Sequence, residues 1–168
     1  IIVAPDAAVK TLTRALELVA PRGRIVVREG VYRDSTIVVR KPVHIEGVGR
    51  STLAGKGAQS ILVIAANVVT VRALRSSGVA TAMVEDPSAM RVVDAARCRI
   101  ENNVVDSAFF GVYLARATDC RVTGNHIRGT GAEGGYHRQD SQRRQAEEAL
   151  RQSEERVRRA QAAARMGS

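Results

Sequence analysis

Aromatic residues are scarce in this chain. Phe, Tyr and Trp together make up 3% of its 168 residues, and tryptophan is absent. The core must therefore come from Val, Ile, Leu and Ala, and the β-branched residues among these favour pleated, half-buried strands. Two cysteines are too few for a disulfide framework, so the redox compartment stays open. No apolar run is long enough to span a membrane.

Acidic residues are also in deficit, with 17 Asp and Glu against 26 Lys and Arg and a net charge of +9. Such an excess suits nucleic acid, an anionic membrane surface or an acidic polysaccharide. The arginines are scattered and few aromatics exist to stack on bases, which argues against specific nucleic-acid binding. No signal segment is visible, so we expect that one has been removed or that the sequence is a fragment.

Residues 1–23 contain a helix signal. Apolar residues at helical spacing predict an amphipathic helix over residues 7–20, which Pro21 and Gly23 would end. We expect this helix to cap the N-terminal opening of the domain that follows. The apolar positions are Val9, Leu12, Leu16 and Val19.

Short strands rich in Val and Ile follow, punctuated by Gly, Ser or Asn. The predicted strands are residues 24–32 with a turn at the Gly, 37–39, 43–45, 61–64 and 69–71. An internal repeat then appears at an offset of 22 residues. It aligns Met90 with Val112, Val92 with Leu114, Ala95 with Ala117, Cys98 with Cys120, Ile100 with Val122, Asn103 with Asn125 and Val105 with Ile127.

A looser upstream copy places Ile61, Val63, Val69 and Val71 in the corresponding positions, separated from the next copy by a predicted loop at residues 80–88. Repeats of this length made of short strands are typical of a solenoid. The sequence therefore predicts an all-β chain whose residues 24–129 form a right-handed parallel β-helix of about five coils.

The same offset stacks opposite charges one coil apart, where neighbouring strands lie about 4.8 Å from each other. The predicted ladder pairs are Asp94 with Arg116, Arg97 with Asp119, and Asp106 with Arg128. Exposed pairs of this kind contribute about 0.2–1 kcal/mol each. Asn103 and Asn125 are predicted to form a structural amide ladder at an inner turn.

Cys98 and Cys120 are predicted to face inward, one coil apart. Three interpretations are open: a disulfide, since the expected Cα separation suits one; a Cu(I) ion held by two thiolates; or two small buried hydrophobes. The sequence favours the last of these. For catalysis the candidate acids are Asp94, Glu101, Asp106 and Asp119. Most of them stack on an arginine, which lowers the pKa of a carboxyl and argues against an enzyme.

Residues 130–137 form a Gly-rich linker by composition. Residues 138–168 are rich in helix formers and predict a charged α-helix. Leu150, Val157 and Ala164 are spaced by seven, so this tail is either a solvated helix or a coiled coil.

Several segments resemble the β-helix domains of carbohydrate-binding proteins and sugar hydrolases, and especially the NosD family. They are residues 25–32, 42–49, 67–72, 110–114 and 124–127. NosD proteins are periplasmic accessory factors for maturation of the copper enzyme nitrous oxide reductase. The resemblance covers about residues 2–129, equivalent to the first coils of these longer proteins. Residues 143–168 resemble the signalling helix that leads into a PAS domain.

The leading expectation from the resemblance is a non-catalytic, periplasmic or extracellular scaffold for copper-enzyme maturation. Its implied partners are an ABC transporter, a copper chaperone and the reductase. The resemblance implies copper in the pathway but places no metal site on this chain. The alternatives are a carbohydrate-binding or polysaccharide lyase or hydrolase β-helix meeting an acidic polysaccharide, and a sensory module coupled to the tail helix. The strand edges after Ile127 also predict self-association or covering by the tail.

Overall fold

The computed structural model describes residues 1–58, 60–79, 87–129, 136–138, 150, 151 and 153. The chain divides into two compact units, Ile1–His137 and Arg138–Ser168. In the second unit, residues 150, 151 and 153 are helical, and the rest of the predicted tail helix and its heptad lies outside the described residues. No helix in the described part of the chain has the length and apolar character needed to cross a bilayer.

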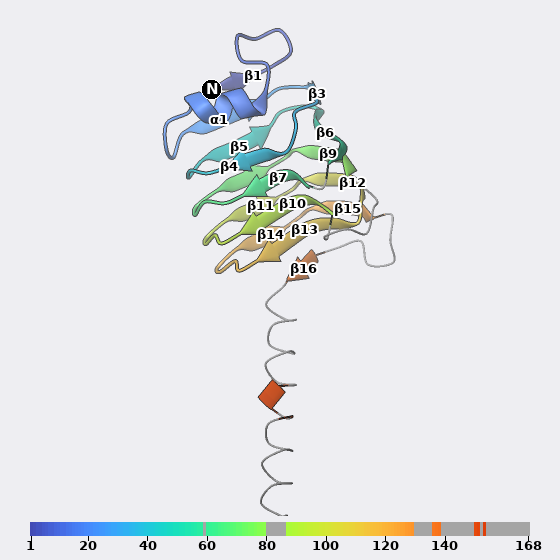
Figure 1. Cartoon of the computed structure of the whole chain (residues 1–168). Coiled ribbons are helices and arrows are strands. Elements are labelled where there is room, and N and C mark those ends of the chain that lie inside the picture. The colour runs from blue at the N-terminus through green and yellow to red at the C-terminus, as the bar shows by residue number, and fades with distance from the viewer. Residues whose placement is uncertain (59, 80–86, 130–135, 139–149, 152, 154–168) are drawn as a thin grey trace, which may run out of the picture. The chain divides into compact units, whose positions relative to one another are not determined.

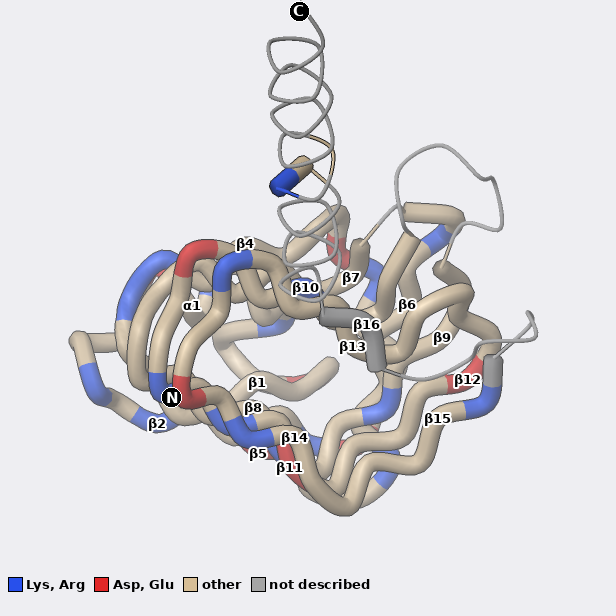
Figure 2. Tube along the Cα trace, turned by 90° about the horizontal axis from the view of Figure 1, so that it is seen from below, with Lys and Arg blue, Asp and Glu red and all other residues tan. Residues whose placement is uncertain are grey.

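The first unit is a right-handed parallel β-helix of about five coils, as predicted (Figure 1). Each coil adds one strand to each of three sheets, and the coils superimpose when seen along the axis (Figure 2). Sheet A contains β1 (Ile2–Val3), β2 (Arg24–Val27), β5 (His44–Gly47), β8 (Thr70–Arg72), β11 (Arg99–Glu101) and β14 (Arg121–Thr123). Sheet B contains β3 (Gly30–Tyr32), β6 (Ser51–Ala58), β9 (Arg75–Val79), β12 (Val104–Ala108) and β15 (His126–Gly129). Sheet C contains β4 (Ile37–Val39), β7 (Ser60–Ile64), β10 (Ser88–Val93), β13 (Phe110–Ala115) and β16 (Tyr136–Arg138).

The register of the last two coils follows the 22-residue repeat. Met90 pairs with Val112, and Val105 pairs with Ile127. Coil length varies upstream: in sheet A, Arg24 pairs with His44, His44 with Thr70, Thr70 with Arg99, and Arg99 with Arg121, so successive coils take 20, 26, 29 and 22 residues. Only the last two coils are therefore related by the offset of 22 residues, which holds in all three sheets.

One part of the predicted upstream alignment is wrong by a residue. Met90 and Val92 stack on Leu62 and Ile64, whereas we expected Ile61 and Val63 there. Val71 does lie beside Ile100, so the segment from Val92 to Ile100 is one residue longer than the segment from Ile64 to Val71. Because strand side chains alternate between faces, a one-residue slip exchanges core and surface positions.

The predicted strand positions hold with small shifts, but four strands were missed, β1, β6, β9 and β16. Glycines break the alternation in β6, and β1 is too short to give a pattern. Ser88, predicted to close a loop, is instead the first residue of β10, where it stacks on Ser60. Residues 80–86 of that predicted loop lie outside the described residues.

The N-terminal helix is shorter than predicted. It spans α1 (Leu12–Leu18), with Thr11 as the N-cap that accepts a hydrogen bond from the Arg14 amide. Asp34 reinforces the cap by accepting from the amide of Leu12 at 3.0 Å. The residues before Thr11 instead form a turn, because Ala4 exchanges backbone hydrogen bonds with Ala7 and Val9 and so closes a local loop.

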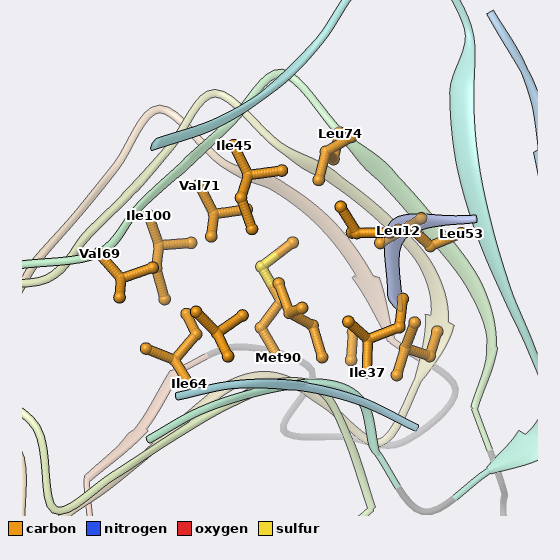
Figure 3. Close-up of a cluster of buried hydrophobic side chains, with 14 of the residues drawn as sticks. Leu12, Ile37, Ile45, Leu53, Ile64, Val69, Val71, Leu74, Met90 and Ile100 are labelled. Carbon is orange, nitrogen blue, oxygen red and sulfur yellow. The ribbon is translucent and has the colours of Figure 1, made fainter. Parts of the chain in front are cut away.

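The core fills the interior of the coils (Figure 3). Inward positions of all three sheets contribute aliphatic side chains, and Leu12, Ala15 and Leu16 of α1 join the same cluster. The helix thus covers the N-terminal end of the core, as Figure 1 also shows. At the other end, residues 136–138 of the predicted linker form β16 beside β13, so Arg138 lies in a strand and not at the start of a helix.

Candidate functional site

The outer face of sheet A carries a column of polar side chains. Alternate residues of each strand point outward, so the residues that flank each buried Ile or Val are brought into one line along the axis. The members of this column are Arg24, His44, Thr70, Arg99 and Arg121, each paired in register with the next. Figure 2 shows lysine and arginine positions recurring along this sheet.

A second row lies at the corner where the chain enters sheet A. Arg22, Val68, Arg97 and Asp119 occupy it, all in the left-handed backbone region with φ of 65°, 57°, 56° and 52°. L-residues adopt this conformation at a cost, and here it makes the corner turn in one coil after another. The turn leaves all four side chains exposed to solvent.

The corner row and the outward column line one groove with a volume of about 530 Å³. Its walls are Arg22, Val68, Thr70, Arg97, Arg99, Asp119 and Arg121. The groove therefore crosses the strands and runs over several successive coils. Four arginines face a single carboxylate in it. We refer to it as the basic groove.

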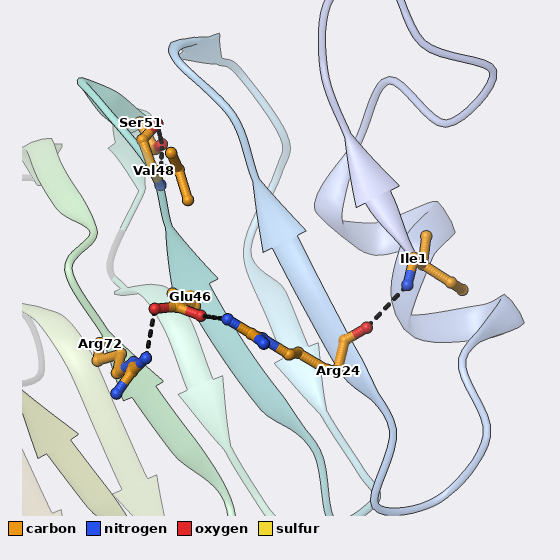
Figure 4. A network of polar contacts seen from close by, with 6 residues as sticks. All are labelled: Ile1, Arg24, Glu46, Val48, Ser51 and Arg72. Carbon is orange, nitrogen blue, oxygen red and sulfur yellow. Dashed lines mark hydrogen bonds and ion pairs between the residues drawn. The ribbon is translucent and has the colours of Figure 1, made fainter.

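No ion pair joins the arginines of the basic groove to an acid within the described residues, in contrast to Arg14, Arg24, Arg72, Arg75 and Arg116. Elsewhere, Glu46 bridges Arg24 and Arg72 across three coils (Figure 4). Hydrogen bonds from Arg24 and then from Arg72 lower the pKa of Glu46. The cations beside the groove are neutralised by protein carboxylates, whereas those inside it are not.

The groove also holds a like-charge stack. Arg99 and Arg121 are direct register partners on neighbouring strands. Like charges directly opposite each other destabilise a sheet. The repulsion between Arg99 and Arg121 disfavours folding, and no acid in the described part of the chain forms an ion pair with either of them. Unfavourable charge arrangements of this kind are typical of functional sites.

His44 lies in the same column, next to Thr70. Burial, and then the positive charge of Arg72, lower the pKa of the His44 imidazole. The imidazole is therefore neutral at pH 7 and adds no charge to the column.

Of the three predicted charge pairs, only one is an ion pair in the structure. Arg116 donates from Nε and Nη2 to the two oxygens of Asp94, at 2.5 and 2.7 Å. These bonds lower the pKa of the Asp94 carboxyl. Arg97 and Asp119 share the corner row without an ion pair between them, and both are exposed, so water competes for their charges.

The third predicted pair stacks in register but forms no ion pair. Asp106 lies between Arg75 of the preceding coil and Arg128 of the following one. Its carboxylate turns to Arg75, at 3.1 Å, while Arg128 donates to the imidazole Nε2 of His126 at 3.2 Å. The predicted stacking of Asp106 on Arg128 is confirmed, but the ion pair forms with the preceding coil because each residue in a solenoid has neighbours in two coils.

Asn103 and Asn125 stack in the structure. The amide nitrogen of Asn103 donates to Oδ1 of Asn125 at 2.9 Å, and its own Oδ1 accepts from the Leu74 backbone at 3.0 Å. Asn103 also donates to the carbonyl of Val71 at 3.1 Å. Asn103 is 1% exposed, so these bonds satisfy groups that water does not reach.

The two cysteines are free thiols at equivalent positions of consecutive coils. Cys98 is buried, and its burial raises the pKa of the thiol to about 11. A thiol ionised only at that pH is a poor ligand for a soft metal at neutral pH. Within the described residues, no group of three or more His, Cys, Asp or Glu could hold a metal ion. Copper at Cys98 and Cys120 stays a prediction.

The candidate catalytic acids do not converge on the groove. Asp94 and Asp106 are held by arginines on other faces, and Glu101 pairs in register with Arg72. Asp119 alone lines the groove among the described residues. The groove was not predicted from the sequence, because the repeat was used only to pair opposite charges. The same alignment nevertheless places Arg99 on Arg121.

The sequence matches no known protein-family profile and no curated protein. Among solved structures, the fold is similar to a pectin methylesterase mutant crystallised in complex with hexasaccharide IV, with a TM-score of 0.51 and 15% sequence identity. The match covers 72% of this chain and 48% of that chain. The shared feature is the fold. The chain spans about half the length of that enzyme.

Proposed function

We propose that this β-helix binds an acidic polysaccharide along the basic groove. The observation that carries the proposal is the set of arginines, Arg22, Arg97, Arg99 and Arg121, that line one groove without an ion-pair partner in the described part of the chain. Guanidinium groups bind carboxylates through charge-assisted hydrogen bonds, often in a bidentate manner. Uronic-acid polymers carry one carboxylate on each sugar and fit this chemistry.

The direction of the groove favours a linear polymer over a small anion. Because the groove runs across the strands, the arginines of the last two coils follow one another along the axis at a spacing of about 4.8 Å. A chain lying in the groove would meet Arg99 and Arg121 in turn and would relieve the repulsion between them. The likeness in fold to a pectin methylesterase is consistent with this proposal but carries no substrate by itself.

We propose binding without cleavage. Glycosidases use two carboxyl groups about 5–10 Å apart across the bond that they break. Asp119 is the one acid that lines the groove in the described residues. With a polysaccharide ligand we also propose a periplasmic or extracellular location.

The test is binding of polygalacturonate, measured by titration calorimetry at low and moderate salt. The Arg99→Gln/Arg121→Gln variant should bind about tenfold more weakly, because each exposed ion pair contributes up to about 1 kcal/mol. The matched control is Arg33→Gln/Arg50→Gln, which removes the same charge from exposed residues outside the groove. This control should keep most of the affinity.

Two further ligands separate a uronate site from a general attraction to anions. Fully methyl-esterified polygalacturonate has lost its charges and should not bind. Single-stranded DNA should bind more weakly than polygalacturonate, because the groove offers no aromatic platform among its lining residues. Equal loss of affinity in the two double variants, or undiminished binding of the ester, would refute the proposal.

Our second proposal is the NosD-like scaffold that docks an ABC transporter, a copper chaperone and nitrous oxide reductase. It is supported by the resemblance and by the β-helix fold, whose three sheets each have an outward face. The resemblance is weaker support than the groove, because the β-helix fold itself requires some of the residues on which the resemblance rests. Gly124 has a φ of +64°, and a Cβ on Gly111 would lie 2.5 Å from Cδ1 of Ile127. Co-purification with the reductase, lost in an Asp94→Arg variant, would favour this proposal over the first.

A further inference from the structure

Cys98 and Cys120 are stacked by the register of the coils. Ala96 forms a parallel bridge with Thr118, and Arg99 pairs with Arg121, which brings the two cysteines opposite each other. Neighbouring strands lie about 4.8 Å apart, within the Cα separation of about 4.4–6.8 Å that a disulfide spans. The backbone therefore needs no rearrangement for the two sulfurs to join.

The two side chains also have equivalent orientations. Each thiol donates to the carbonyl of the residue two positions before it and to a carbonyl of the preceding coil. For Cys98 these acceptors are Ala96 at 3.7 Å and Ala66 at 3.4 Å, and for Cys120 they are Thr118 at 3.3 Å and Ala95 at 3.9 Å. The thiols thus point the same way, and the neighbouring Cys120 contributes to the raised pKa of Cys98.

Access to the two thiols differs. Cys98 is 1% exposed, whereas Cys120 is only partly buried. A reagent in solution therefore reaches Cys120 first. Cys98 lies in the preceding coil and is shielded from solvent. Its position therefore suits a resolving thiol, which reacts second.

We propose that Cys98 and Cys120 are an oxidisable pair that closes into a disulfide between the last two coils. The oxidant is a low-molecular-weight disulfide such as oxidised glutathione. The Cys120 thiolate attacks one of its sulfurs, which forms a mixed disulfide and releases one glutathione thiolate. The Cys98 thiolate then attacks the Cys120 sulfur, which forms the protein disulfide and releases the second glutathione. The two cysteines are oxidised, losing two protons and two electrons, and the glutathione disulfide is reduced to two thiols.

The bridge would fasten the last coil of sheets A and B to the coil before it. In the described part of the chain, β14 and β15 each pair with one neighbouring strand, in sheets A and B. Arg97 and Arg99 flank Cys98, and Asp119 and Arg121 flank Cys120, so the bridge would also fasten the walls of the basic groove. Formation of the disulfide does not depend on what the groove binds.

The test is oxidation of the full chain with glutathione disulfide, followed by intact mass and thermal unfolding. The wild type should lose two hydrogens without gaining glutathione, and its Tm should rise by about 10 °C because the bridge closes a loop of about 22 residues. Dithiothreitol should reverse both changes. Cys98→Ala should stop at a glutathione adduct on Cys120 and should show no rise in Tm.

The second reaction gives a kinetic readout. The rate of ring closure from the isolated adduct should rise about tenfold with each unit of increase in pH, up to about pH 10, because the Cys98 thiolate is the attacking group. The proposal is overturned if the wild type stays as the adduct, if Cys120 links two chains, or if the bridged protein unfolds at the same temperature as the reduced one. Cys120→Ala should remain unmodified, and an adduct on its Cys98 would contradict the order of reaction.

Discussion

Replacing Asn103 by Ala tests the stacking of the coils most sharply, since this side chain bonds to the coil on either side of it. Loss of the amide would leave the Leu74 N–H and the Val71 carbonyl without the bonds that they now make at 3.0 and 3.1 Å. Both residues are fully buried. A buried polar group left unpaired costs about 1–3 kcal/mol, so we expect the free energy of unfolding to fall by about 3 kcal/mol.

Asn125→Ala is the matched comparison in the next coil. It removes the acceptor for the Asn103 backbone at 2.9 Å and the donor to Ile100 at 2.8 Å. Asn125 is only partly buried, so water can replace these bonds, and we expect a loss of about 1 kcal/mol. Both changes are measured by urea unfolding followed by circular dichroism. A loss below about 1 kcal/mol for Asn103→Ala, or a larger loss for Asn125→Ala, would refute the ladder as a source of stability.

Three further changes probe the packing and the charges. Gly47→Ala would place a Cβ 2.1 Å from the carbonyl oxygen of Ala73 and should lower the free energy of unfolding in urea by about 3 kcal/mol. In Gly57→Ala the new Cβ meets no atom within 4 Å, so the loss should be about 1 kcal/mol, caused by the positive φ. Leu12→Ala should cost about 3 kcal/mol because its buried side chain closes the core at the N-terminal end, and a loss near zero would show that α1 is not a cap. Glu46→Gln tests the ion pairs by pH: since the folded pKa of Glu46 is lowered, the stability that it adds is present above the pKa of unfolded glutamate and is lost as the pH falls through the folded value. The Tm difference between wild type and variant should therefore disappear in acid, and a difference that persists there would assign it to packing.

The β-helix was predictable because its last two coils are related by one offset in all three sheets. This offset of 22 residues brings Cys98 onto Cys120 and Asn103 onto Asn125, and the pattern is visible without any structure. The upstream coils differ in length, so the same comparison slipped by one residue at Leu62. Strands such as β6, broken by glycines, gave no alternation to detect.

The basic groove was harder to predict because it depends on side chains from several coils of unequal length. Arg22 and Val68 are separated by two coils, of 20 and 26 residues, so an alignment at one fixed offset cannot place them in the same row. Choosing between ion pairs also needs coordinates, as Asp106 shows by pairing with the preceding coil. The sequence did carry one signal, since its repeat stacks Arg99 on Arg121.

The most direct test of the proposed function is to observe the arginine side chains while the ligand is added. In a ¹⁵N-arginine-labelled sample titrated with oligogalacturonate, the Nε–H signals of Arg97, Arg99 and Arg121 should shift together and saturate at one ligand concentration. Those of Arg33 and Arg50 should stay in place. If the groove signals do not move, or if all exposed arginines shift alike, the groove is not a polysaccharide site.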